Sequence, residues 1–374
     1  MKICHISFDH TWNDTRVYKR EIKSQVEAGF KVVYFGWDKP ADVIDVDVQF
    51  ISYADHRLSR KERLKLFVSN RKMVNKLIDL NADVYQFHDF TLLEVGRKLK
   101  KAGKHVIFDS HENYLDTIPA KVGNGGVLAH IFKSLMDLYY RKVVSQFDAI
   151  FTVSPNFVQM LRKYNPRTFM VSNYPSIKNF EISEAKDKEN IFIYQGTVYG
   201  FSNQEEIVRA INQVGEEVRY MIIGNIADEE KVIVENDIKN RVDVKGWVDK
   251  KTLDSILQHS IAGIVVFDYV PECCYQDGQV GSNKIFEYML NGLPVICTDF
   301  RLWKEMIIDK YRCGICVKPG SVEQIKDAIE WMLLNPEESR KMGERGRYAI
   351  INEFNWEKGL PEYIALYEQI AKDK

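Results

Sequence analysis

The alternation of short apolar runs with helical patterns along the whole chain most constrains the fold. Runs of β-branched and aromatic residues, for example at 191–195 and 262–267, are separated by amphipathic segments. This alternation is typical of parallel sheets whose strands are joined by crossover helices. The sequence therefore predicts an α/β protein.

The strand candidates fall into two series. The first comprises 2–8, 31–36, 84–88, 105–109 and 149–153, and the second 191–195, 219–224, 242–245, 262–267, 293–298 and 314–317. A polar stretch without sustained periodicity separates the series, and 374 residues exceed what one compact core usually holds. We therefore expect an N-terminal domain at 1–172, a linker at 173–190 and a C-terminal domain at 191–356. The last helix, 357–374, is expected to complete the first domain.

Helix boundaries show in the capping residues. A helix at 16–28 is followed by Gly29, and Ser154 with Pro155 marks another helix start. Ser321 and Gln324 have the spacing of a capping box, which predicts a helix to about Leu334.

Charge and cysteine usage limit the class of protein. The 52 basic and 53 acidic residues give a net charge of −1, so nothing indicates nucleic-acid binding. The first residues lack the apolar stretch of a secretion signal, and the six cysteines lack the second pair of a zinc site. A lone CxxC, Cys313 to Cys316, is expected to pack in the core. We expect a cytoplasmic protein without a bound metal or cofactor.

Glycine-rich phosphate loops of the usual kinds are missing. No strand candidate is followed by GxGxxG or by GxxxxGK[ST], and the GNGG at Gly123 follows no strand, which indicates a flexible turn. The sequence therefore argues against a dinucleotide-dependent oxidoreductase and against a P-loop NTPase.

The densest signal is GSNKIFEYMLNGLPVICTD, residues 281–299, which predicts a loop, a short helix and a buried strand. Unpaired N–H groups of Ser282 and Asn283 at the helix start suit a phosphate, and Lys284 adds a charge there. Lys284 and Glu287 share a helix face, so one could reach a diphosphate while the other accepts hydrogen bonds from ribose hydroxyls. A plain surface ion pair between them is the alternative.

This segment resembles the nucleotide-sugar site of the retaining family 4 glycosyltransferases of the GT-B fold. DTRVYKREIKSQVEAGFKVVYFG from Asp14, FDSHENY from Phe108, GWVDKKTLDSIL from Gly246 and NPEESRKMGERGRYAIINEFNWE from Asn335 are similar to its other landmarks, in the same order. The resemblance implies two Rossmann-like parallel-sheet domains facing a central cleft. It also implies a metal-independent hexosyltransferase that uses a nucleotide-sugar donor and a glycan or lipid-linked acceptor in polysaccharide biosynthesis.

The resemblance also assigns roles to residues. Glu287 would bind the donor ribose, Lys284 would lie near the diphosphate, and His111 would sit beside the transferred sugar. The remaining donor-side candidates are Gly196, Thr197, Gly224, Trp247, Gln279, Ser282 and Asn283, and the acceptor-side candidates are Asp14, Thr15, Arg16 and Glu112.

Three of these residues have structural alternatives. His111 could tether a loop, and Trp247 could pack in the core. Asp14 could cap a helix whose Arg16 is solvated.

Departures from the family pattern keep other functions open. The family usually has a glutamate eight positions before Glu287, where this chain has Gln279; Glu272 or Asp277 could substitute. It also has an arginine and a lysine near the first strand of the second domain, where this chain has Thr197 and Ser202. The alternatives are a nucleotide-sugar-binding pseudoenzyme in a glycan-assembly complex and a GT-B nucleotide-sugar 2-epimerase.

Residues 57–76 hold eight basic residues and one acid, interleaved with apolar residues. Such a helix could contact anionic lipid at the inner face of a membrane. The alternative is an ordinary crossover helix whose apolar stripe packs on the first sheet.

Overall fold

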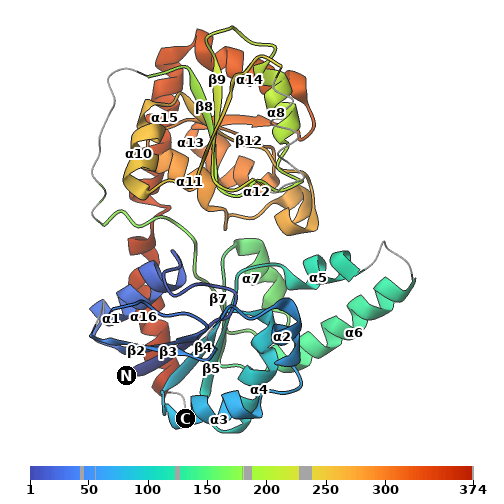
Figure 1. Cartoon of the computed structure of the whole chain (residues 1–374), viewed down its shortest axis with the longest axis vertical. Helices are drawn as coiled ribbons and strands as arrows, with labels where there is room; N and C mark the ends of the chain where they lie inside the picture. Colours follow the sequence, from blue (N-terminus) through green and yellow to red (C-terminus); the bar gives the residue numbers. More distant parts are fainter. Residues whose placement is uncertain are drawn as a thin grey trace. The chain divides into compact units, whose positions relative to one another are not determined.

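The computed structural model describes residues 1–42, 46–54, 56–122, 127–178, 180, 188–226 and 238–372. The chain forms two compact units (Figure 1). Unit 1 comprises Met1–Asn173 and Gly359–Lys374, and unit 2 comprises Tyr174–Lys358. The expected linker at 173–190 begins at this boundary, but its residues 179 and 181–187 lie outside the described part, as does the GNGG segment.

Unit 1 is built on a sheet of seven parallel strands in the order β3-β2-β1-β4-β5-β6-β7. The strands are β1 (Lys2–Ile6), β2 (Lys31–Gly36), β3 (Val48–Ser52), β4 (Val84–Phe87), β5 (His105–Ser110), β6 (Ala149–Thr152) and β7 (Thr168–Met170). In the centre, Ile3 of β1 pairs with Val32 of β2 and with Val84 of β4. The five strands expected here are confirmed. The two edge strands β3 and β7 were not predicted, because their residues are only partly buried and show no continuous apolar run.

Helices cover both faces of this sheet (Figure 1). They are α1 (Lys23–Glu27), α2 (Arg60–Lys65), α3 (Arg71–Asp79), α4 (Leu93–Lys101), α5 (Tyr114–Val122), α6 (Val127–Val144), α7 (Pro155–Leu161) and α16 (Trp356–Lys372). The helix expected at 16–28 is present, but its first half, Val17–Ile22, is π-helical. The start expected at Ser154 is confirmed, since α7 begins at Pro155.

Unit 2 is built on a sheet of six parallel strands in the order β10-β9-β8-β11-β12-β13. The strands are β8 (Ile191–Gln195), β9 (Arg219–Ile223), β10 (Val242–Gly246), β11 (Ala262–Val265), β12 (Val295–Thr298) and β13 (Gly314–Val317). All six expected strands are confirmed. The helices are α8 (Gln204–Ile211), α10 (Lys250–His259), α11 (Asn283–Leu290), α12 (Arg301–Trp303), α13 (Asp309–Tyr311), α14 (Val322–Leu334) and α15 (Pro336–Asn352). The Ser321 hydroxyl accepts the N–H of Gln324, so the expected cap of α14 is confirmed.

Both sheets reverse their strand order once. The reversal lies between β1 and β4 in unit 1 and between β8 and β11 in unit 2. Open α/β sheets bind ligands beyond the carboxyl ends of their strands at such switch points, because the loops there diverge to opposite sides. The residues that follow these strands are therefore candidates for a ligand-binding site.

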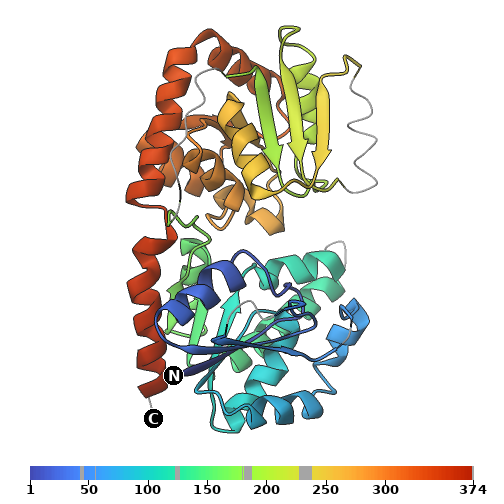
Figure 2. The same ribbon diagram turned by 60° about the vertical axis from the view of Figure 1, so that its left-hand side comes forward.

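Helix α16 completes unit 1 at the C-terminus (Figure 2). Its inward residues Tyr363, Leu366, Tyr367 and Ile370 are buried, and the Tyr363 ring lies 5.9 Å from that of Phe151 in β6. The helix is thus part of the unit 1 core.

Candidate functional site

Three glycines end neighbouring strands at the carboxyl edge of the unit 2 sheet. Gly196, Gly224 and Gly246 follow or end β8, β9 and β10 with φ values of 109°, 139° and 66°, which L side chains rarely adopt. A Cβ on Gly224 would lie 2.2 Å from the carbonyl oxygen of Gly196. The two backbones therefore approach closely, and the edge carries no side chain at these points.

Lys284 reaches this edge from the first turn of α11. Its ammonium group lies 5.4 Å from the ring centroids of both Tyr194 in β8 and Phe267 after β11. A Cβ on Gly196 would lie 2.8 Å from the Lys284 Cε atom, so the glycine leaves room for the lysine stem. Lys284 thus sits at the switch point of the unit 2 sheet.

The charge of Lys284 has no carboxylate partner among the described residues. Burial lowers the pKa of Lys284 to about 8. The faces of three aromatic rings, Tyr194, Tyr199 and Phe267, lie within 6 Å of its ammonium group and offset only part of the lost hydration. A partly buried cation of this kind is poised to pair with an anion.

Glu287 lies one turn further along α11 and pairs with Lys250, a residue that was not predicted for the site. Its Oε2 is 2.9 Å from the ammonium group of Lys250, which also contacts Asp254 at 2.7 Å. The alternative of a Lys284–Glu287 ion pair is wrong, because the lysine stem turns toward Gly196. Lys250 was detectable in principle, since Asp249 accepts the N–H of Thr252 and so places Lys250 at the start of α10.

The other donor-side candidates differ in what they offer a ligand. Thr197 and Asn283 are exposed, and the Ser282 hydroxyl makes no capping bond at the start of α11. Trp247 is 80% exposed, so core packing for it is wrong. Gln279 is committed to its own loop, because its Oε1 accepts the N–H of Gly281 at 2.8 Å.

Two residues at positions that depart from the family pattern are also engaged elsewhere. Asp277 forms an ion pair with Arg301 at 2.7 Å. Ser202 is fully buried, and its hydroxyl accepts the N–H of Tyr199 at 2.9 Å. Lys284 therefore remains a largely buried cation at this edge without a carboxylate partner among the described residues.

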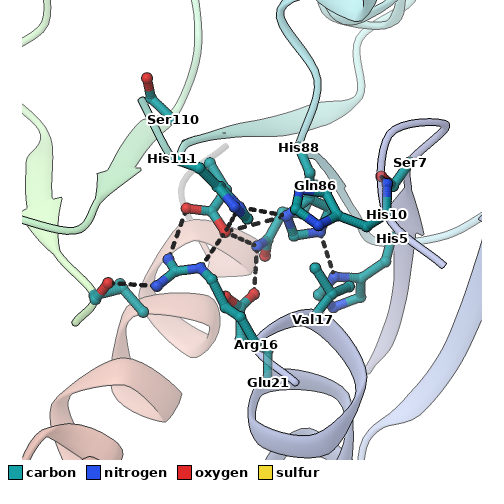
Figure 3. Close-up of polar contacts among 12 residues, drawn as sticks. His5, Ser7, His10, Arg16, Val17, Glu21, Gln86, His88, Ser110 and His111 are labelled. Carbon is teal, nitrogen blue, oxygen red and sulfur yellow. Dashed lines mark hydrogen bonds and ion pairs between the residues drawn. The ribbon is translucent and has the colours of Figure 1, made fainter. Parts of the chain in front are cut away.

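Near the switch point of unit 1, Arg16, His88 and His111 belong to one cluster of polar side chains (Figure 3). Asp109, buried at the end of β5, contacts all three. Asp109 Oδ1 accepts a hydrogen bond from Arg16 at 2.8 Å. Its Oδ2 lies 3.0 Å from His111 Nε2 and 3.1 Å from His88 Nδ1. His111 was predicted as a site residue, but Asp109 and His88 were not. Both could have been recognised in the sequence, because each is a charged or polar residue at the end of an apolar strand.

Arg16 is placed differently from expectation. It is buried and bonds Asp109, with Glu21 at 3.0 Å, and also donates to the Val171 carbonyl at 2.7 Å. A solvated Arg16 is therefore wrong, because the buried Asp109 carboxylate requires a cation beside it. Although burial disfavours the charged carboxylate, the guanidinium holds the pKa of Asp109 well below its usual range.

A chain of buried rings leads inward from this cluster. His88 Nε2 is 3.0 Å from His5 Nδ1, and His5 Nε2 is 2.8 Å from the Oε1 of Gln25. Burial lowers the pKa of His5 to about 3 and that of His88 to about 4, so both rings are neutral near pH 7. Gln25 donates to the hydroxyl of Tyr363 at 2.8 Å, which links α16 to the cluster.

The acceptor-side candidates lie beside residues of this cluster. Asp14 accepts the N–H groups of Arg16 and Val17 at 2.8 and 2.9 Å, so the expected cap is present. Its Oδ2 is 3.2 Å from His10 Nδ1. Burial opposes charge on His10, but the Asp14 carboxylate outweighs it and raises the pKa of His10. Thr15 and Glu112 are exposed.

His88, Asp109 and His111 also have the composition of a metal-binding triad. However, Asp109 already accepts hydrogen bonds from Arg16 and from Gln86 Nε2, the latter at 3.3 Å. A second cation beside the buried guanidinium would be repelled. The group is therefore better described as a hydrogen-bonded cluster.

Comparison with known proteins identifies relatives for this arrangement. Residues 176–349 match the family model of glycosyl transferases group 1. An uncharacterized glycosyltransferase of Methanocaldococcus jannaschii is 22% identical over 265 residues. The match covers 64% of this chain and 64% of the length of that relative.

Solved structures match the chain over nearly its full length. Sucrose-phosphate synthase from Thermosynechococcus elongatus has a TM-score of 0.77 at 18% identity, covering 99% of this chain and 98% of that one. Anabaena HepE in complex with UDP-glucose has a TM-score of 0.71 at 12% identity, covering 99% of both chains. At these identities the likeness establishes the fold.

Proposed function

We propose that the chain is a glycosyltransferase, because residues 176–349 match the family model of glycosyl transferases group 1 and the chain has the GT-B fold. From this premise we propose that it moves a hexose-type sugar from a nucleoside diphosphate sugar to a glycan or lipid-linked acceptor in polysaccharide assembly. We propose transfer with retention of anomeric configuration, because the chain resembles retaining family 4 enzymes.

The observation that carries the proposal is the charge of Lys284 at the unit 2 switch point. Lys284 lacks a carboxylate partner among the described residues and extends from the N-terminal turn of α11, whose Ser282 makes no side-chain cap to the backbone N–H groups. A diphosphate would satisfy both the ammonium group and the helix terminus. When the bond between sugar and diphosphate breaks, the same groups would stabilise the negative charge on the leaving diphosphate.

The neighbouring residues fit the rest of a nucleotide-sugar. Gly196 and Gly224 bring bare backbone to the edge, which allows the close approach that a phosphate needs. Glu287 would accept hydrogen bonds from the ribose hydroxyls, and the exposed ring of Trp247 would lie toward the base. The neighbour HepE was solved with UDP-glucose, which supports a donor of this class.

A second candidate function is a binding protein that holds a nucleotide-sugar without turning it over. Two observations favour it: Gln279 is hydrogen-bonded to Gly281, and Thr197 is uncharged. Neither side chain could then stabilise the negative charge on a departing diphosphate, so only Lys284 and backbone N–H groups would do so. A 2-epimerase is the third. Incubation with donor and acceptor separates them: transfer to the acceptor supports the transferase, conversion of the donor into its C2 epimer with the diphosphate still attached supports the epimerase, and binding alone supports the binding protein.

The first test is a thermal-shift screen against UDP-, GDP-, ADP- and dTDP-sugars. A ligand that binds the native state raises its stability by RT ln(1 + [L]/Kd), so the true donor is expected to give the largest shift. If none of the four classes raises the melting temperature, the proposed donor site is wrong.

The second test compares two variants of the α10–α11 ion pair in calorimetry with the selected donor. Glu287→Ala is expected to abolish binding, because it removes the ribose acceptor. Lys250→Ala removes only the partner of Glu287 and is expected to retain affinity within a few fold. Equal losses in both variants would show that the ion pair acts structurally and that Glu287 does not bind the donor.

We also propose that no divalent ion is needed, since Lys284 and the helix terminus take the place of a metal at the diphosphate. Activity is then expected to survive EDTA. Loss on chelation with recovery on adding manganese would contradict this.

The third part of the proposal is a peripheral contact with anionic lipid through unit 1. No helix in the described part of the chain is long and apolar enough to cross a membrane. The single helix predicted over 57–76 is wrong, because the segment forms two shorter helices, α2 and α3. Its apolar residues Leu66, Met73 and Val74 are buried, as crossover packing predicted, whereas Leu64 and Val68 are exposed. The cations Arg60, Lys61, Lys65, Arg71, Lys72 and Lys76 remain exposed.

An apolar stripe lies beside this basic face. Ile131, Leu135 and Leu138 of α6 are 51%, 61% and 64% exposed and share one helix face. Phe67, which follows α2, contacts Tyr139 of α6 with ring centroids 6.3 Å apart, so the two surfaces adjoin. Cations beside an exposed apolar stripe are typical of lipid-surface contact.

Sedimentation with phosphatidylglycerol vesicles tests this contact. Binding is expected to weaken with salt and to be lost in Lys61→Glu/Lys65→Glu or in Leu135→Ser/Leu138→Ser. Binding that is unchanged in both double variants would contradict it.

A further inference from the structure

We propose that Asp109 is a positioning residue that keeps the proton of His111 on Nε2, so that Nδ1 faces the ligand as a hydrogen-bond acceptor. The ligand class in this inference, a sugar with free hydroxyl groups, rests on the proposed function. The proton position itself does not.

The placement of the His111 ring supports this. Nε2 faces inward, 3.0 Å from Asp109 Oδ2 and 3.2 Å from His88 Nδ1 (Figure 3). Nδ1 has no hydrogen-bond partner within the described residues, and the side chain is 12% exposed. The ring therefore has one nitrogen bound to the cluster and one without a hydrogen-bond partner in the described part of the chain.

The neighbours of Asp109 determine where the proton lies. Arg16 donates to both carboxylate oxygens, at 2.8 and 3.3 Å, and Gln86 Nε2 donates to Oδ2. Although burial opposes charge on Asp109, the Arg16 guanidinium holds its pKa well below the usual range, whereas burial and Asp109 raise the pKa of the neighbouring Glu21. Asp109 therefore accepts these hydrogen bonds and carries no proton near pH 7. Burial lowers the pKa of His111, so its ring is neutral near pH 7 and holds a single proton. That proton lies on Nε2, where the carboxylate accepts it.

Two rings restrain His111 from turning. The centroid of His10 lies 4.7 Å away, and that of His88 lies 5.4 Å away in an edge-on arrangement. A flip of the imidazole would remove the Asp109 bond from Nε2 and leave a buried carboxylate less well satisfied. The position of Nδ1 is thus set by the cluster behind it.

This polarity selects the ligand group. An imidazole nitrogen without a proton can accept a hydrogen bond from a hydroxyl group, whereas an ionised phosphoryl oxygen has no proton to donate. The unit 1 edge is therefore built to meet a sugar hydroxyl.

Nitrogen-15 NMR of histidine-labelled protein at pH 7.5 tests the proton position without any ligand. The His111 resonances are assigned by their loss in His111→Gln. We expect Nε2 protonated and Nδ1 unprotonated in the unmodified protein. A His111 ring protonated on Nδ1, or on both nitrogens, would overturn the inference.

Asp109→Asn supplies the matched change. Arg16 is expected to hold the amide oxygen, which turns the amide N–H toward His111 Nε2 and moves the ring proton to Nδ1. We expect the tautomer to switch, kcat for turnover of the donor found in the screen to fall about tenfold or more, and KM for that donor to stay within about threefold. An unchanged tautomer in a folded variant would overturn the inference.

Asp148→Asn is the control. Asp148 lies 3.3 Å from Nδ1 of His105, at the opposite end of β5, and is also held by a cation, Lys100. The change is expected to leave the His111 tautomer and kcat as they are. If kcat falls in both variants while the His111 tautomer holds, Asp109 acts through stability alone. If the tautomer switches while no donor binds even the unmodified protein, the proposed function fails and the proton assignment stands.

Discussion

Lys284 shows how the surroundings of one residue set its chemistry. The lysine stem crosses Gly196, and three aromatic rings surround the ammonium group, so burial lowers its pKa to about 8. Below this pH the group carries a charge that a bound diphosphate can pair with. Binding an anion would raise the pKa again, so ligand affinity is linked to pH.

We therefore expect donor affinity to be steady below about pH 7 and to fall by up to about tenfold per unit above pH 8. Lys284→Met keeps the apolar stem and removes the charge, so it is expected to weaken binding about 10- to 100-fold and to abolish this pH dependence. Lys318→Met, at an exposed position after β13 of the same sheet, is the control. Calorimetry at several pH values measures both effects, and a pH profile that Lys284→Met leaves unchanged would contradict the assignment.

At the scale of elements, β1 and β4 bring two uncharged histidines together. His5 and His88 are fully buried, with pKa values of about 3 and about 4 in the folded protein. In the unfolded chain a histidine titrates near 6.5. Between these values the unfolded chain binds more protons, so acid favours unfolding.

Stability from this pair is thus fully present above about pH 6.5 and is lost as pH falls toward 4, by up to about 1.4 kcal/mol per pH unit for each ring. Urea unfolding at pH 7, 6, 5 and 4 measures the slope. His5→Gln is expected to reduce it by about one proton, whereas His259→Gln, at an exposed position, should not. If the slope of unfolding free energy against pH is the same in the unmodified protein and in both variants, the buried histidine pair does not cause it.

The glycines at the ends of β8 and β9 allow a second prediction at this scale. Gly224→Ala adds a Cβ 2.2 Å from the Gly196 carbonyl oxygen at a φ that alanine rarely adopts, so we expect a loss of about 2 to 4 kcal/mol. Gly246→Ala meets no atom within 4 Å and should cost only the conformational strain, about 1 kcal/mol. Denaturant titration compares them. Equal losses would show that the close approach of the two backbones is unimportant.

For the whole molecule, the C-terminal helix links the end of the chain to the cluster of unit 1. Tyr363 accepts from Gln25, and the Tyr367 hydroxyl donates to Gln86, which also contacts Glu21 and Asp109. The last residues of the chain therefore hold side chains of the cluster around His111 in place.

Removing residues 361–374 is expected to expose the apolar surface of unit 1 and to lower its melting temperature by roughly 10 °C or more. Four buried side chains are lost, Tyr363, Leu366, Tyr367 and Ile370, each worth about 1.5 to 3 kcal/mol. Glu368→Gln, on the exposed face of the same helix, is the control. Calorimetric melting decides, and a truncated protein that melts like the full chain would refute the packing.

Local patterns were sufficient to predict most of the fold. The runs 191–195 and 314–317 coincide with β8 and β13, and Ser321 caps α14 as its spacing indicated, because backbone preference and capping act within a few residues. Such patterns could not predict the edge strands β3 and β7, because half-exposed strands lack a continuous apolar run. The position of Lys284 and Glu287 on one helix face also followed from spacing.

Which polar groups meet was decided only by the tertiary structure. Arg16 and Asp109 are 93 residues apart, and Gln25 and Tyr363 are 338 apart, yet each pair shares a hydrogen bond in the core. Sequence spacing could not show that Arg16 lies between the acidic side chains of Glu21 and Asp109, or that Glu287 takes Lys250 as its partner. A buried polar side chain must find a partner wherever the strand order brings one, and strand order depends on long-range contacts that no local period records.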